Sequence, residues 1–169
     1  MGVRKMSEEC RPNVTVFNSA LETGIRSLVI LAANFPAAMD LQRLVDFDYL
    51  VVHSGDLDGP ESLHPPLPMR EGELLVRRKI IESGILLMMS RGLVTRIAGA
   101  EGIVYQASDY AKPFVDSLTT PYMNSLIDRA NWVGDTFGSM DTIDLHNLIS
   151  GFFNKWTTQF HPSRGLGGS

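Results

Sequence analysis

The sequence has a single cysteine, Cys10, which lies in a polar stretch near the start of the chain. One cysteine cannot form an internal disulfide, so a reducing compartment suits this protein. The longest apolar runs fall far below the roughly 20 residues that span a bilayer, and no apolar segment of a signal peptide follows Arg4 and Lys5. We therefore expect a cytoplasmic protein that does not enter the membrane.

The motifs of common catalytic sites are also missing. The sequence has no GxxxxGK[ST] loop, no GxGxxG loop and no GxSxG elbow, and Cys10 in a flexible leader is a poor nucleophile. Positive charge is scarce, because 15 Lys and Arg face 19 Asp and Glu for a net charge of −4. This balance argues against a protein that coats nucleic acid, although a local basic face is compatible with it. We expect no enzyme activity, no metal and no cofactor.

Apolar residues are plentiful, at 44% of 169 residues, which is enough for one domain with an ample core. Residues 70–107 organise the chain, because they predict a long helix, a stop at Arg91-Gly92 and two strands at 93–97 and 103–107. The apolar positions of the long helix recur at three- and four-residue steps, so most of them should face the core. They are Leu74, Leu75, Ile80, Ile81, Ile85, Leu87 and Met88.

Two shorter helices precede the long one. Ser19 caps a predicted helix over residues 20–34, which Phe35-Pro36 ends, and Asp40 caps a second one over 41–52. Three helices followed by a hairpin predict an α+β, mainly helical fold with a winged-helix-like core, in which the hairpin is the wing. The buried stripe expected on the first helix consists of Leu21, Ile25, Leu28, Val29 and Ala32.

Further helices are predicted after the hairpin. Ser108 or Asp109 should cap a fourth helix that ends at Leu118, and Thr120-Pro121 opens a fifth that runs to about Trp132 or Phe137. A sixth, opened by Asp141 and Thr142, is apolar enough to close the core or to dock on another chain. The predicted organisation is a flexible leader (1–13), a winged-helix-like domain (14–137), a C-terminal helix (138–160) and a flexible tail (161–169).

A long Pro-rich loop over residues 53–69 separates the second and third helices. It holds four of the nine prolines and two glycines, so we expect neither helix nor strand there. A DNA-reading helix-turn-helix has a turn of only about 3–4 residues at this place. The loop also gathers four candidate metal ligands at irregular spacing, and turns closed by Asp side chains are the favoured explanation for them. These four are His53, Asp56, Asp58 and His64.

The long helix carries a basic run, Arg77-Arg78-Lys79. It could contact phosphates beside the wing together with Arg70, Arg91 and Arg96. The favoured alternative is a solvated helix face in which Glu73 pairs with Arg77 and Arg78 pairs with Glu82 at i,i+4 spacing. Acidic residues expected around this face would repel DNA: Asp46, Asp48, Asp56, Asp58 and Glu61.

Three stretches carry a resemblance to a known family. They are VFNSALETGIRSLVIL, MDLQRLVDFDYLVVHSGDLDGPESLHPPLPMREGELLVRRKIIESGILLMMSRGLV and GIVYQASDYAKPFVDSLTTPYMNSLIDRANWV. Over roughly residues 14–134 the chain resembles the small middle component of ABC-three-component systems, of the type called middle component two. The ordered string HSGD…SLHPP…GELLVRR is its most specific part.

The resemblance implies a prokaryotic conflict module. Such a module has an ABC-type ATPase related to the SMC family, an effector such as a nuclease and a small subunit between them. These systems are grouped with Lamassu-like antiviral defence against phage and plasmids. The resemblance implies no catalytic residue for the small subunit.

Together, the residues and the resemblance favour a non-catalytic adaptor that bridges the SMC-like ATPase and the effector. DNA contact is expected only within the complex, and self-association stays open. A winged-helix transcription regulator and a small enzyme that uses the His53–His64 loop remain as alternatives. A Pro-rich loop loses little entropy on docking, which favours it, with the basic run and the last helix, as the partner contact. The residues predicted to make it are His53, Asp56, Leu63, His64, Pro65, Pro66, Arg77, Arg78, Phe152, Phe153 and Trp156.

Overall fold

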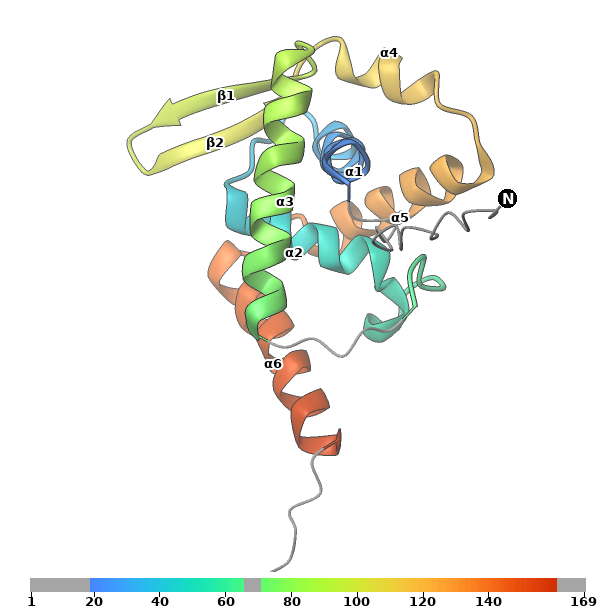
Figure 1. The fold of residues 1–169 in the computed structure, drawn as a ribbon, viewed down its shortest axis with the longest axis vertical. Coiled ribbons are helices and arrows are strands. Elements are labelled where there is room, and N and C mark those ends of the chain that lie inside the picture. The colour runs from blue at the N-terminus through green and yellow to red at the C-terminus, as the bar shows by residue number, and fades with distance from the viewer. Residues whose placement is uncertain (1–18, 66–70, 161–169) are drawn as a thin grey trace, which may run out of the picture.

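The computed structural model describes residues 19–65 and 71–160, with the side chains of 71–74 and 153–160 left out. The fold there is mainly helical with one small antiparallel sheet, which confirms the predicted α+β class (Figure 1). Its elements are α1 (Ala20–Ala33), α2 (Leu41–Val52), a 3-10 turn η2 (Ser54–Leu57), α3 (Glu71–Ser90), β1 (Val94–Gly99), β2 (Gly102–Ala107), α4 (Ala111–Asp116), α5 (Pro121–Phe137) and α6 (Thr142–Phe160).

Helix α2 is the centre of the fold. Every residue from Leu44 to Val52 is buried, because α1, α3, α5 and α6 all pack against this helix. The fully buried large side chains come from five helices and form one continuous core. They are Leu28, Ile30, Leu31, Leu44, Phe47, Leu50, Ile81, Ile85, Leu126, Leu145 and Ile149.

Three of the helix caps predicted from the sequence are confirmed. Backbone N–H groups donate to the side chains of Ser19 (3.2 Å), Asp40 (2.7 Å) and Thr120 (3.2 Å), at the starts of α1, α2 and α5. Gly92 has a φ of 70°, the left-handed conformation that glycine adopts readily after a helix. The predicted cap of the fourth helix is wrong. The Ser108 hydroxyl donates instead to the Gly92 carbonyl (2.7 Å), and α4 begins after Tyr110 without a side-chain cap.

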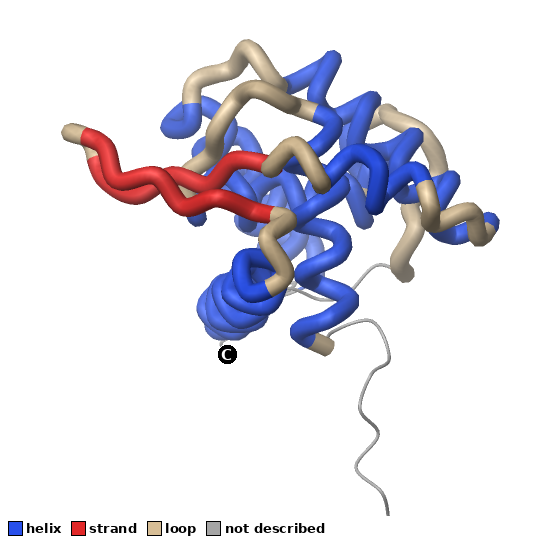
Figure 2. The backbone as a smooth tube through the Cα atoms, turned by 90° about the horizontal axis from the view of Figure 1, so that it is seen from above, coloured by secondary structure: helices blue, strands red, loops and turns tan. Residues whose placement is uncertain are grey.

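Strands β1 and β2 form the predicted hairpin, which projects from the helical body (Figures 1 and 2). The sequence did not reveal that Met39, just before α2, pairs with Tyr105 of β2. Met39 N–H donates to Tyr105 C=O (2.9 Å), and Tyr105 N–H donates to Met39 C=O (2.7 Å). The hairpin is therefore tied to the body through the segment that joins α1 to α2.

Helices α1 and α3 cross at two glycines. A Cβ added to Gly84 would lie 2.6 Å from the Gly24 nitrogen, so the two backbones are in direct contact. The closely packed side of α1 therefore carries small residues, and Leu21 is 57% exposed. The prediction of Leu21 and Leu75 as core residues is wrong, since Leu75 is 66% exposed at the outer side of α3.

Two further differences from the sequence prediction concern the loop and the last helix. Residues 54–57 form a 3-10 turn, so the prediction that the loop has no helical part is wrong there. Helix α6 closes the core with Leu145 and Ile149, while Phe152 is half-buried. The side chains of Phe153 and Trp156, and the whole of Pro66, lie outside the described residues.

Candidate functional site

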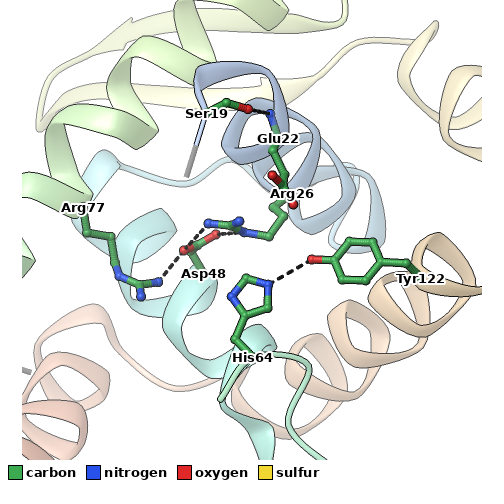
Figure 3. Close-up of polar contacts among 7 residues, drawn as sticks. All are labelled: Ser19, Glu22, Arg26, Asp48, His64, Arg77 and Tyr122. Atoms are coloured by element: carbon green, nitrogen blue, oxygen red, sulfur yellow. Dashed lines mark hydrogen bonds and ion pairs between the residues drawn. The ribbon is translucent and has the colours of Figure 1, made fainter. Parts of the chain in front are cut away.

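Three helices are joined by one buried carboxylate (Figure 3). Asp48 of α2 accepts two hydrogen bonds from Arg26 of α1, at 2.7 Å from Nε and 3.1 Å from Nη2. It also accepts from Nη1 of Arg77 of α3, at 2.6 Å. The paired geometry with Arg26 is the strongest form of such a contact. Asp48 therefore holds α1, α2 and α3 in one arrangement.

The electrostatics of this cluster depend on the guanidiniums. Burial of Asp48 opposes its ionisation, but the charges and hydrogen bonds of Arg26 and Arg77 outweigh burial and lower the pKa of Asp48 below its ordinary value. Asp48 is thus an anion in the interior. The prediction that Asp46 and Asp48 surround the basic face at the surface is wrong, because both are buried.

Residues of the Pro-rich loop lie beside this cluster. The Tyr49 hydroxyl donates to Asp56 (2.9 Å), and His64 Nε2 is 3.1 Å from the Tyr122 hydroxyl of α5. The rings of His53 and His64 are 6.5 Å apart, edge to face. His53 is only 2% exposed, and its Nε2 has no hydrogen-bond partner among the described residues. The described part of the loop is therefore folded onto the core.

The two histidines are neutral at physiological pH. Burial lowers the pKa of each to about 4, and the nearby charges of Arg77 at His53 and of Arg26 at His64 act in the same direction. Burial and the Asp56 hydrogen bond raise the pKa of the Tyr49 phenol. Neither a charged imidazole nor a phenolate is available here at pH 7.

A second polar cluster joins α2 to α6. The amide nitrogen of Gln42 donates to Asp46 (3.2 Å), and His146 Nδ1 lies 3.3 Å from the same carboxylate oxygen. Burial raises the pKa of Asp46, although the contact with His146 opposes the rise. Arg78 of α3 donates to the Gln42 side-chain oxygen (3.1 Å). Arg78 thus bonds to α2, and its predicted ion pair with Glu82 does not occur in the part of the chain that the structure describes.

This geometry fits a structural role for the polar residues. Within residues 19–65 and 75–152, where side chains are described, no three His, Cys, Asp or Glu residues converge as metal ligands would. The buried charges are used in ion pairs, and the two neutral histidines are loop residues that pack against the core.

Comparison with protein families settles which group the chain resembles. The model of the ABC-three component (ABC-3C) system Middle Component 2 matches residues 16–159. The chain belongs to this family. No curated protein and no solved structure matches it. The resemblance read from the sequence is therefore confirmed, and it makes the chain one component of a multi-subunit system.

The residues predicted to contact a partner differ in burial in the structure of this middle component. His53 lies in the interior and Arg77 is bound to Asp48, so both serve the fold. Pro65 and Arg78 are exposed, and their partner contact stays a prediction. Asp56, Leu63, His64 and Phe152 are half-buried. No helix within the described residues of the middle component is both long and apolar enough to cross a membrane.

Acidification is expected to destabilise the middle component between about pH 6.5 and pH 4. The unfolded chain binds protons on His53 and His64 near pH 6.5, whereas the folded chain binds them only near pH 4. The folded state thus holds fewer protons in this window, so the free energy of unfolding falls as pH falls. The slope approaches about 2.7 kcal/mol per pH unit when both histidines contribute, at about 1.36 each. Asp46 acts in the opposite direction, because its raised pKa means that the folded chain binds a proton there more readily than the unfolded chain does. It therefore offsets part of the loss of stability at the acidic end of this window.

Urea unfolding at a series of pH values measures this slope. The His64→Gln variant, which takes up one proton fewer on unfolding, should show about half of it. A free energy of unfolding that stays flat from pH 7 to pH 4.5 would rule out buried neutral histidines.

Proposed function

We propose that this middle component is a non-catalytic adaptor in the cytoplasm of a prokaryote. It bridges an SMC-related ABC ATPase and an effector such as a nuclease, in an antiviral defence complex. The observation that carries the proposal is the family match over residues 16–159. The buried charged groups form ion pairs with one another inside the protein, which supports a binding role rather than catalysis.

The order of elements supports a winged-helix assignment for the core. Helix α1, the Met39 bridge, α2, α3 and the hairpin follow one another as in a winged helix, with α3 as the second helix of the helix-turn-helix. Winged helices bind proteins as well as DNA, so the fold alone does not choose between them. The inserted loop between α2 and α3 favours protein, because a DNA reader needs a short turn there.

The outer side of α3 is the surface on which we expect a partner. Leu75 and Leu86 lie on one stripe of the helix at 66% and 59% exposure. Arg78, Lys79 and Glu82 are exposed beside them. Large apolar side chains exposed on one stripe, with an arginine beside them, are typical of a protein interface. Pro65 of the loop is also exposed and completes the set of expected contacts.

Replacing Arg78 and Lys79 together with Glu is expected to reduce recovery of the ATPase at least about tenfold in co-purification from the complete operon. The reversed charges would repel an acidic partner across the interface. The temperature of thermal unfolding should fall only slightly, because Lys79 is exposed and Arg78 loses a single hydrogen bond to Gln42 at an exposed position.

Lys112→Glu is the matched control, because Lys112 is 78% exposed on α4, away from α3. It should leave recovery unchanged. Full recovery with the double variant would remove the outer side of α3 from the interface. Arg77 is unsuitable for this test, because Arg77→Glu would place a second carboxylate against Asp48.

A winged-helix transcription regulator is the second candidate. Four exposed cations favour it: Arg78, Lys79, Arg91 and Arg96. It predicts that the isolated protein binds duplex DNA with affinity that falls steeply with salt. Absence of binding at low salt would remove this candidate.

A further inference from the structure

The hairpin leaves one edge of its sheet open. The sheet has two strands, and Met39 pairs with the far side of β2. Among the described residues, no strand pairs with the outer side of β1. Figure 2 shows the hairpin extending beyond the helices, so helices do not cover its outer half.

The hydrogen bonds of Tyr105 reveal which groups of β1 face outward. Both Tyr105 backbone groups bond to Met39, away from β1. Arg96, which lies opposite Tyr105 in the register, must then be in a non-hydrogen-bonded pair. Its N–H and C=O point away from β2, and by alternation those of Ala98 do too. Thr95 and Ile97, in contrast, bond across to β2.

This edge lacks the features that usually block pairing. Residues 94–99 contain no proline, and every residue pairs with β2 in continuous register, so there is no bulge. Natural edge strands are commonly protected by such features or by charge. Arg96 is the single charged residue of the strand, and Ile97 beside it is 38% exposed. An exposed edge of this kind is a template for an added strand.

The charged residues around β1 indicate which side chains an added strand would carry. Arg91 follows the end of α3, Arg96 lies on β1, and both are exposed. β1 carries no acidic residue, and exposed carboxylates close to it in the chain are Glu101 in the hairpin turn and Asp109 after β2. Twofold pairing of two β1 edges would bring the Arg96 side chains of two copies towards each other, which is unfavourable. A partner strand with carboxylates complements the charges of Arg91 and Arg96.

We propose that the open edge of β1 binds an extended segment of a partner protein, in which acidic residues alternate with apolar ones. Successive side chains of a strand point to opposite faces. Because Arg96 and Ile97 are neighbours, the carboxylates of the added strand lie on the Arg96 face and its apolar residues cover Ile97. The proposal rests on the adaptor function, for which it specifies a mode of binding.

Residue-resolved amide hydrogen exchange on the full chain tests the pairing. The probe is a short peptide of alternating Glu and Val, with peptides of Lys and Val and of Glu and Ser as controls. The Glu and Val peptide should slow exchange at Arg96 and Ala98 at least about tenfold. Thr95 and Ile97, already bonded within the hairpin, should change little. Unchanged exchange at Arg96 and Ala98 would overturn the proposal, as would equal slowing by duplex DNA.

Two substitutions at one position provide a matched pair. Ala98→Pro removes an outward N–H without removing a bond of the hairpin, which edge strands tolerate, whereas Ala98→Val keeps that N–H. We expect at least about a tenfold loss of peptide affinity for Ala98→Pro alone. Protection of Ile97 in this variant shows that the hairpin is intact. Equal affinity of the two variants would contradict strand addition.

Co-purification from the operon separates this proposal from the adaptor function. Ala98→Pro is expected to lose the ATPase or the effector, whereas Ala98→Val retains both. If Ala98→Pro retains both partners, strand addition is wrong and the adaptor function stands. If the unaltered chain recovers neither partner, the adaptor function itself fails.

Discussion

Replacing Asp48 with Asn should lower the free energy of unfolding by about 3–5 kcal/mol, the range for removing one partner of a buried ion pair. Asp48 is completely buried, and its carboxylate compensates Arg26, whose side chain is 3% exposed. The amide would remove the buried counter-charge that Arg26 and Arg77 share. Urea unfolding monitored by circular dichroism measures the loss.

Two controls separate loss of charge compensation from a general effect of removing a carboxylate. Asp116→Asn breaks an exposed pair with Lys112 on α4 and should cost only about 0.3–0.5 kcal/mol. Replacing Arg26, Asp48 and Arg77 together with Met, Leu and Met should cost much less than Asp48→Asn, because no unpaired charge remains. A loss below about 1 kcal/mol for Asp48→Asn would contradict the buried cluster, since such losses are ordinary for single substitutions.

Gly84→Ala is expected to lower the free energy of unfolding by about 1–3 kcal/mol, the cost of forcing extra atoms into a packed core. Helix propensity alone predicts a gain of up to about 1 kcal/mol for this change, so the sign is diagnostic. The new Cβ would lie 2.6 Å from the Gly24 nitrogen and 2.8 Å from its Cα. Backbone atoms cannot turn aside as a side chain can, so α1 and α3 must separate.

Gly151→Ala is the matched control. Gly151 lies in α6, and nothing lies within 4 Å of a Cβ built there. Alanine should stabilise this position by about 0.5–1 kcal/mol. Chemical unfolding of both variants under one condition gives the comparison. If Gly84→Ala stabilises the protein as Gly151→Ala does, the close crossing of α1 and α3 is wrong.

Features with a local cause could be predicted from the sequence. The side chains of Ser19, Asp40 and Thr120 bond backbone groups only three residues along the chain, so the sequence around each cap contains the whole interaction. The same holds for the hairpin and for the glycine stop after α3. The family resemblance was also readable, because it rests on an ordered string of residue types.

The buried cluster could not be predicted, because its partners are distant in sequence. Asp48 lies 22 positions from Arg26 and 29 from Arg77. From spacing alone, Arg77 fitted a helix-surface pair with Glu73, four residues earlier. Arg26 interrupts the apolar pattern of α1 too little to indicate that its side chain is buried. A charge is buried only where its partner is buried too, and that depends on how the helices pack.

The pairing of Met39 with Tyr105 was missed for a related reason. One residue between two helices has no alternation of its own, so it carries no strand signal. Leu75 shows the opposite kind of error, because it was predicted to be buried and is exposed. Periodicity placed it in the core, but α1 crosses α3 near Gly84, nine residues further along, and Leu75 stays at the surface.

The adaptor function requires this chain to be one subunit of a larger assembly. Native mass spectrometry of the tagged chain, purified after expression of its complete operon, tests it most directly. We predict a complex with the ABC ATPase and the effector in a fixed ratio, with all three released together when the tag is cleaved. A chain that is recovered without either protein, or with duplex DNA alone, would contradict the adaptor function.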